Sequence, residues 1–176
     1  MALFRATGEE IGMSENNDDL YADVIGPTNT NYYLAYFKRA DERGYTPLAW
    51  HWPVLFADVF WFLYRKQYRW AGIVTLISLL ILVVAGQIGR MGYPDLGVAV
   101  QLILLAAFKL VYVPLRANAL YYDWVQHRIQ LVQAALPGNL MEQKSMLTKL
   151  GGTSFTAPLM IVALLFMLAS LLPPPG

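Results

Sequence analysis

The chain has 176 residues, of which 57% are hydrophobic and only 14% are charged. A soluble domain averages about a quarter charged residues, so this excess of apolar side chains indicates a protein that contacts lipid. Cysteine is absent, which excludes disulfides, thiolate nucleophiles and thiolate metal ligands. Residues 1–50 carry a net charge of −4 and the remainder +5, without the concentrated basic face that nucleic-acid binding requires.

Residues 1–49 predict an acidic, cytosolic N-terminal segment with one short helix. The first apolar run begins only near Pro53, so we expect no cleaved signal peptide. The acidic run between Glu15 and Asp23 is interpreted as a solvated face. Apolar spacing predicts the helix over Asn31–Arg43, with Asn29 or Thr30 as its N-cap and Gly44 as a left-handed C-cap residue.

Residues 50–70, WHWPVLFADVFWFLYRKQYRW, predict an aromatic helix that lies in the membrane interface. We expect the rings of Trp61 and Tyr64 at headgroup depth and Arg65 directed towards lipid phosphate. Asp58 is the exception in this helix. The simplest interpretation pairs it with Arg65 or with a backbone donor, and a functional carboxylate is the alternative. Whether the helix lies flat or dips into the bilayer stays open.

Residues 71–176 predict a three-span membrane domain, because three long apolar runs approach the roughly 20 residues that cross a bilayer. The expected spans are Ala71–Ile88, Gly97–Leu115 and Phe155–Leu172. The connection at 116–154 predicts two amphipathic cytosolic helices, the second capped by Asn139. Both basic flanks then lie on one side, which predicts a cytoplasmic N-terminus and a periplasmic C-terminus.

The predicted fold class is therefore an all-α membrane protein with three transmembrane helices, an aromatic interfacial helix and short amphipathic cytosolic helices. Lys109 is the one charge inside a predicted span, and such residues are costly and often functional. It can snorkel to the interface, form an internal ion pair with Asp58, or serve transport. Gln101 lies on the same side of this span, so we expect that side to pack against protein.

Four short patterns resemble a family of bacterial membrane proteins. They are Tyr32-Tyr33-Leu34-x-x-Phe37, Trp50-x-Trp52, Trp61-x-x-Tyr64-Arg65-Lys66-x-Tyr68 and Ala117-Asn118-x-x-Tyr121-Tyr122. This chain resembles, over roughly residues 31–130, the family known as domain of unknown function 2628. The resemblance implies a small bacterial inner-membrane protein and no particular chemistry. The family commonly has a Gly-Pro break in the aromatic run, where this chain has Ala57-Asp58-Val59.

No nucleotide-binding loop, zinc-binding HExxH motif or nucleophile elbow occurs, and we expect no enzyme activity, cofactor or metal. His51 and His127 lie on separate segments, where ordinary hydrogen bonds are the simpler expectation. The leading hypothesis is an accessory, assembly or regulatory subunit that binds a membrane protein partner or a second copy. The alternatives are a small oligomeric transporter or channel component that uses Lys109, and an immunity-type protein against a membrane-acting toxin.

Overall fold

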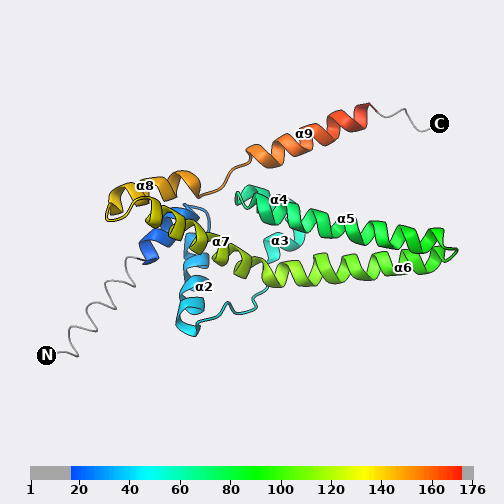
Figure 1. Ribbon diagram of the computed structural model, residues 1–176, viewed down its shortest axis with the longest axis horizontal. Helices are drawn as coiled ribbons and strands as arrows, with labels where there is room; N and C mark the ends of the chain where they lie inside the picture. Colours follow the sequence, from blue (N-terminus) through cyan, green and yellow to red (C-terminus); the bar gives the residue numbers. More distant parts are fainter. Residues whose placement is uncertain (1–16, 172–176) are drawn as a thin grey trace. The chain divides into compact units, whose positions relative to one another are not determined.

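The computed structural model describes residues 17–171, and all regular elements in this part of the chain are helices, without a β-strand (Figure 1). It divides into two compact units. Unit 1 comprises residues 17–48 and 118–153, and unit 2 comprises residues 49–117 and 154–171. The sequence predictions for residues 1–16, for Leu172 and for the three prolines at 173–175 lie outside the described residues.

Unit 1 contains a helical stretch at 17–25, α2 (Thr30–Arg43), most of α7 (Val113–Ala135) and α8 (Leu140–Leu150). The helical stretch at 17–25 precedes α2, although the sequence predicted only one short helix in this segment. Gly44 has a φ of 69°, as its predicted C-cap role requires. Asn29 precedes α2 in a left-handed conformation but makes no side-chain cap, while the Thr30 hydroxyl donates to the Gly26 carbonyl.

The core of unit 1 is aromatic and joins segments that are distant in sequence. Phe37 of α2 is fully buried, and its ring centroid lies 5.3 Å from Tyr21, 5.8 Å from Tyr121 and 5.2 Å from Tyr122. The hydroxyls of Tyr21 and Tyr122 both donate to the carboxylate of Asp41. Burial, reinforced by Asp41, raises the pKa of both phenols, so both remain protonated donors.

Acidic residues of the helical stretch at 17–25 take part in two ion pairs within unit 1. Asp18 lies 2.5 Å from the ammonium of Lys38, and Asp19 lies 2.7 Å from that of Lys144 on α8. The acidic residues that were predicted to form a solvated face therefore also form ion pairs with α2 and α8. Because most of these side chains are substantially exposed to water, each pair contributes little to stability.

Helix α8 begins and ends as its sequence dictates. The Asn139 side chain accepts a hydrogen bond from the Glu142 N–H, which confirms the predicted cap. At the other end, a Cβ on Gly151 would lie 2.1 Å from the carbonyl oxygen of Val24. Only glycine permits this approach, which places the Gly152 N–H 2.8 Å from the same carbonyl.

Unit 2 contains α3 (Trp52–Ala57), α4 (Val59–Tyr64), α5 (Tyr68–Arg90), α6 (Pro94–Leu105), the π-helix η1 (Ala106–Tyr112), the start of α7 and α9 (Thr156–Ser170). Helices α5 and α6 form an antiparallel hairpin, drawn in green in Figure 1. Gly97 makes this packing possible, because a Cβ there would lie 2.7 Å from the Ala85 carbonyl and 3.0 Å from the Gly89 nitrogen.

Two helices are long and apolar enough to cross a membrane. They are α5, with 23 residues, and the continuous 42-residue helix Pro94–Ala135 that joins α6, η1 and α7. Only 17% and 11% of their most apolar windows are buried, which is unlike the core helix of a soluble protein. Helix α9 is apolar but has only 15 residues, fewer than the roughly 20 that cross a bilayer. The structure thus shows two helices of spanning length where the sequence predicted three spans.

Candidate functional site

The predicted interfacial helix is broken at Asp58. Helix α3 ends at Ala57 and α4 begins at Val59, while Asp58 has φ 46° and ψ −125°. A non-glycine residue at such a positive φ carries roughly 1–3 kcal/mol of strain. The prediction of a single helix over this segment is therefore wrong. The break occurs here without glycine or proline.

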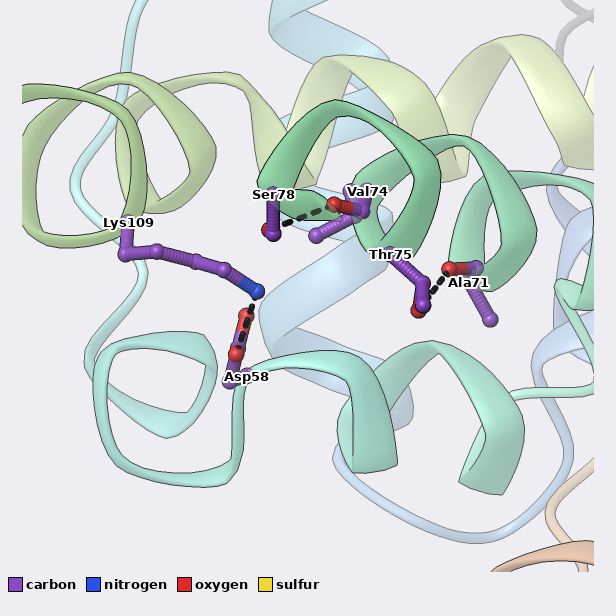
Figure 2. A network of polar contacts seen from close by, with 6 residues as sticks. All are labelled: Asp58, Ala71, Val74, Thr75, Ser78 and Lys109. Carbon is purple, nitrogen blue, oxygen red and sulfur yellow. Dashed lines mark hydrogen bonds and ion pairs between the residues drawn. The ribbon is translucent and has the colours of Figure 1, made fainter. Parts of the chain in front are cut away.

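Lys109 forms an ion pair with Asp58 across 51 positions of sequence. Its ammonium nitrogen lies 2.6 Å from Asp58 Oδ2, and the two side chains are 20% and 41% exposed. Figure 2 shows Lys109 extending from its helix towards Asp58, with Ser78 and Thr75 of α5 in the same close-up. The structure thus selects the internal ion pair over snorkelling, and Asp58 pairs with Lys109 rather than with Arg65.

The helix that carries Lys109 is not a regular α-helix. Lys109 lies at the centre of the seven-residue π-helix η1, which is uncommon in length and position. Pro114 follows shortly and has no N–H to donate to the carbonyl of Leu110, so the regular hydrogen-bond ladder cannot continue through this turn. The Phe108 and Tyr112 rings stack within η1 at 5.9 Å. Sequence analysis predicted this span but not its π turns.

Ser78 and Thr75 place two hydroxyl groups on the apolar helix α5. Their hydroxyls donate to the carbonyls of Val74 at 2.7 Å and Ala71 at 2.8 Å, as the dashed lines in Figure 2 show. Each hydroxyl is therefore satisfied by its own helix. Asp58 Oδ1, in contrast, is buried and accepts no hydrogen bond from the part of the chain between residues 17 and 171.

Arg65 occupies a different place from the one predicted. It is only 1% exposed, at the end of α4, so its guanidinium does not reach out to lipid phosphate. It lies close enough to His51 to lower the pKa of that imidazole. Arg65 is thus part of the core of unit 2, whereas Arg69 at the same basic end is exposed.

Trp61 and Tyr64 both pack inside unit 2. Trp61 is 5% exposed, and its ring lies 4.7 Å from His51. The Tyr64 ring lies 4.7 Å from Phe155, and its carbonyl accepts the Ser154 N–H at 2.9 Å. Tyr64 therefore ties α4 to the start of α9. Trp61 lies in the protein interior of unit 2.

Gln101 does not join the ion pair. It is half-buried on α6, and no hydrogen bond in residues 17–171 links it to Lys109 or Asp58. Of the six predicted site residues, the structure brings Asp58 and Lys109 into direct contact and buries Trp61 and Arg65 in the core of unit 2, while Tyr64 is half-buried.

His51 is a residue whose role sequence reasoning missed. It is 2% exposed, its ring Nδ1 accepts the Val54 N–H at 3.3 Å, and its backbone N–H donates to the Pro114 carbonyl at 3.1 Å. Burial, followed by the charge of Arg65, lowers the pKa of His51 to about 4. A neutral ring is what the cap requires, because Nδ1 must accept. The position of His51 just before Trp52-Pro53 was the available signal for a helix N-cap.

Gln67 was also missed, since nothing in its sequence context marks it. It is fully buried between α4 and α5, and neither side-chain polar atom has a partner in residues 17–171. The described residues contain no group of three or more histidine and acidic side chains that would hold a metal ion.

These observations define an all-α protein with two helices able to cross a membrane, and with an ion pair between a strained helix break and a π-helix. The chain belongs to the family Protein of unknown function (DUF2628), whose model matches residues 28–127. No curated protein and no solved structure matches the chain.

The resemblance motifs acquire a structural meaning within each unit. In unit 1, the Asn118 amide donates to the Tyr32 hydroxyl at 2.9 Å, and the Tyr33 and Tyr121 rings lie 4.9 Å apart. The tyrosine-rich and asparagine-containing motifs are thus bonded to each other. Tyr33, Asn118 and Tyr121 are buried in the core of unit 1.

Proposed function

We propose that this chain is a non-enzymatic, multi-pass protein of the bacterial inner membrane that binds a membrane protein partner. It would act as an accessory, assembly or regulatory subunit. The observation that carries the proposal is the exposure of α9, where every side chain from Leu159 to Leu171 is exposed in the isolated chain. A helix that is apolar on all sides requires lipid or protein around it.

The ion pair supports binding over transport. Lys109 is a charge in the apolar part of the long helix Pro94–Ala135, and Asp58 pairs with it inside unit 2. A charge that is matched within the fold stabilises a scaffold, whereas a transported solute needs a group that it can reach. If α9 also crosses the membrane when a partner covers it, the chain has three spans. Its N-terminus would then lie in the cytoplasm and its C-terminus in the periplasm.

Copurification tests the subunit proposal. The chain is extracted in a mild detergent and analysed by native mass spectrometry, which is expected to detect a second protein in fixed stoichiometry. Phe166→Gln, at a side chain that is 78% exposed on α9, should release that protein. Met91→Gln, at a 77% exposed position in the α5–α6 turn, is the matched control and should retain it. A monomeric wild-type chain would contradict the proposal.

A transporter component is the second candidate. It is favoured by Asp58 Oδ1, which is buried without a hydrogen-bond partner among residues 17–171 and belongs to a carboxylate paired with a π-helix, since π turns are frequent at functional sites. The double variant Asp58→Asn/Lys109→Leu removes both charges together. A scaffold should keep its partner after this change, and a transporter should lose solute or ion flux in proteoliposomes. A periplasm-active reporter fused to the C-terminus tests the orientation, because activity is expected only if that end is outside.

A further inference from the structure

A groove of about 410 Å³ lies on unit 2 between α4, α5 and α9. Its walls include Leu63 of α4, Leu76 and Leu79 of α5, and Ile161 of α9, and Gly72 forms part of its floor. Thr75 also lines the groove, but its hydroxyl donates to the Ala71 carbonyl of its own helix, as Figure 2 shows. The groove is therefore an apolar surface, because the Thr75 hydroxyl already donates its proton within α5.

One end of this groove is basic and aromatic. Positions 69, 72, 76 and 79 follow a spacing of three and four residues, so Arg69 lies on the same face of α5 as the groove-lining Gly72 and Leu76. Arg69 is exposed, and its guanidinium lies 5.9 Å from the Trp70 ring centroid. No ion pair joins Arg69 to any residue in the described range 17–171. Tyr68, 53% exposed, lines the groove beside it.

This order of groups matches an amphiphile. We propose that the groove binds one acyl chain of an anionic phospholipid, whose phosphate is bound by Arg69. Arg69 is exposed at this end, and residues 59–79 contain no acidic residue, which favours an anionic headgroup. The Tyr68 ring, apolar with a polar tip, suits the boundary between headgroup and hydrocarbon.

The size of the groove favours a lipid chain over a protein helix. Gly72 and Leu79 are about 10 Å apart along α5, and a helix of 10–12 Å diameter and that length occupies roughly 800–1,100 Å³. That is at least about twice the volume of the groove. A single acyl chain, one methylene in cross-section, is thin enough for a groove of this volume. The proposal rests on the membrane placement proposed above.

Two glycines of α5 provide a matched pair of variants. A Cβ built at Gly72 or at Gly86 meets no heavy atom within 4 Å, so both positions accept a side chain without a clash. Gly72→Leu places its side chain in the groove, whereas Gly86→Leu makes the same change on the same helix away from it. Both changes also improve helix propensity, so neither is expected to unfold the protein.

The experiment is a titration of the purified chain with palmitoyl-oleoyl phosphatidylglycerol or phosphatidylcholine, followed by native mass spectrometry. Wild type should bind one phosphatidylglycerol about fivefold more tightly than phosphatidylcholine, which corresponds to about 1 kcal/mol for one basic residue. Arg69→Gln should abolish this preference and keep phosphatidylcholine binding. Gly72→Leu should weaken both lipids about tenfold or more, and Gly86→Leu should leave both unchanged.

Several outcomes overturn the lipid site. They are unchanged binding by Gly72→Leu, equal weakening by Gly86→Leu, a headgroup preference that survives Arg69→Gln, or release of a bound protein rather than lipid by Gly72→Leu. A carbonate wash of membranes separates this failure from failure of the proposed function. A chain that washes off contradicts the membrane placement, while one that stays and lacks the titrated lipid contradicts only the site.

Discussion

Removing the charge of Asp58 tests whether the ion pair with Lys109 holds unit 2 together. Asp58→Asn retains the size of the side chain, and asparagine tolerates a positive φ better than most residues. The substitution therefore leaves the helix break nearly as strained as before and removes one charge. What remains is the Lys109 ammonium without its partner at 2.6 Å.

The expected loss can be worked from the geometry. At 2.6 Å and an effective dielectric constant of about 20, the gross attraction is about 6 kcal/mol, most of which desolvation offsets. Breaking a fully buried pair costs about 3–5 kcal/mol, and an exposed pair is worth at most about 1 kcal/mol. With side chains 20% and 41% exposed, this pair is intermediate, and we expect Asp58→Asn to cost about 2–3 kcal/mol.

Reversible unfolding in mixed micelles of a mild detergent and sodium dodecyl sulfate, followed by circular dichroism, measures this loss. The double variant Asp58→Asn/Lys109→Leu should recover most of it, because no uncompensated charge remains. Asp58→Gly should be less destabilised than Asp58→Asn by about 1 kcal/mol or more, since glycine relieves the strain at φ 46°. If Asp58→Asn lies within about 0.5 kcal/mol of wild type, or the double-variant cycle shows no coupling, the reasoning is refuted.

Three further predictions follow from individual contacts. Since the pKa of His51 is lowered from 6.5 to about 4, its contribution to folding stability is complete above about pH 6.5 and falls by up to about 3 kcal/mol as the pH drops towards 4. The ring resonance is assigned by its loss in His51→Gln, and its NMR titration should show this low pKa. An inflection near pH 6.5 would contradict the prediction. Gly97→Ala should destabilise the α5–α6 hairpin by about 1–3 kcal/mol through its contact with the Ala85 carbonyl, whereas Gly86→Ala, which meets nothing within 4 Å, should be neutral or stabilising in the same micelle unfolding assay. Gly151→Ala should expose backbone amides of residues 17–25 to hydrogen exchange, because its Cβ would lie 2.1 Å from the Val24 carbonyl; unchanged protection would show that the approach is not required.

Several elements were predictable because their signals are local. The apolar run at 71–88 lies within α5, which extends it by three residues at one end and two at the other. The Gly44 C-cap and the Asn139 N-cap both depend on residues within one helical turn. Helix type, caps and long apolar runs could thus be derived without tertiary contacts.

The candidate site was only partly predictable. Asp58 and Lys109 stood out because each places a charge in an apolar stretch, and their pairing was one of the alternatives. Choosing it required the positive φ at Asp58, which neither glycine nor proline marks in this sequence. The burial of Arg65 depends on where α4 packs, so the expectation that it faces lipid could not be corrected from spacing alone.

The sequence by itself determined that this chain is helical, that it carries long apolar helices, and that its charges are few and unevenly distributed. These properties follow from composition and from periodicity over a few turns. Tertiary structure decided that Asp58 breaks the aromatic helix, that Lys109 is its partner from 51 positions away, and that Gly72 forms part of the floor of a groove. The physical reason is that backbone strain persists only where surrounding contacts stabilise it, and those contacts come from segments that local patterns do not connect.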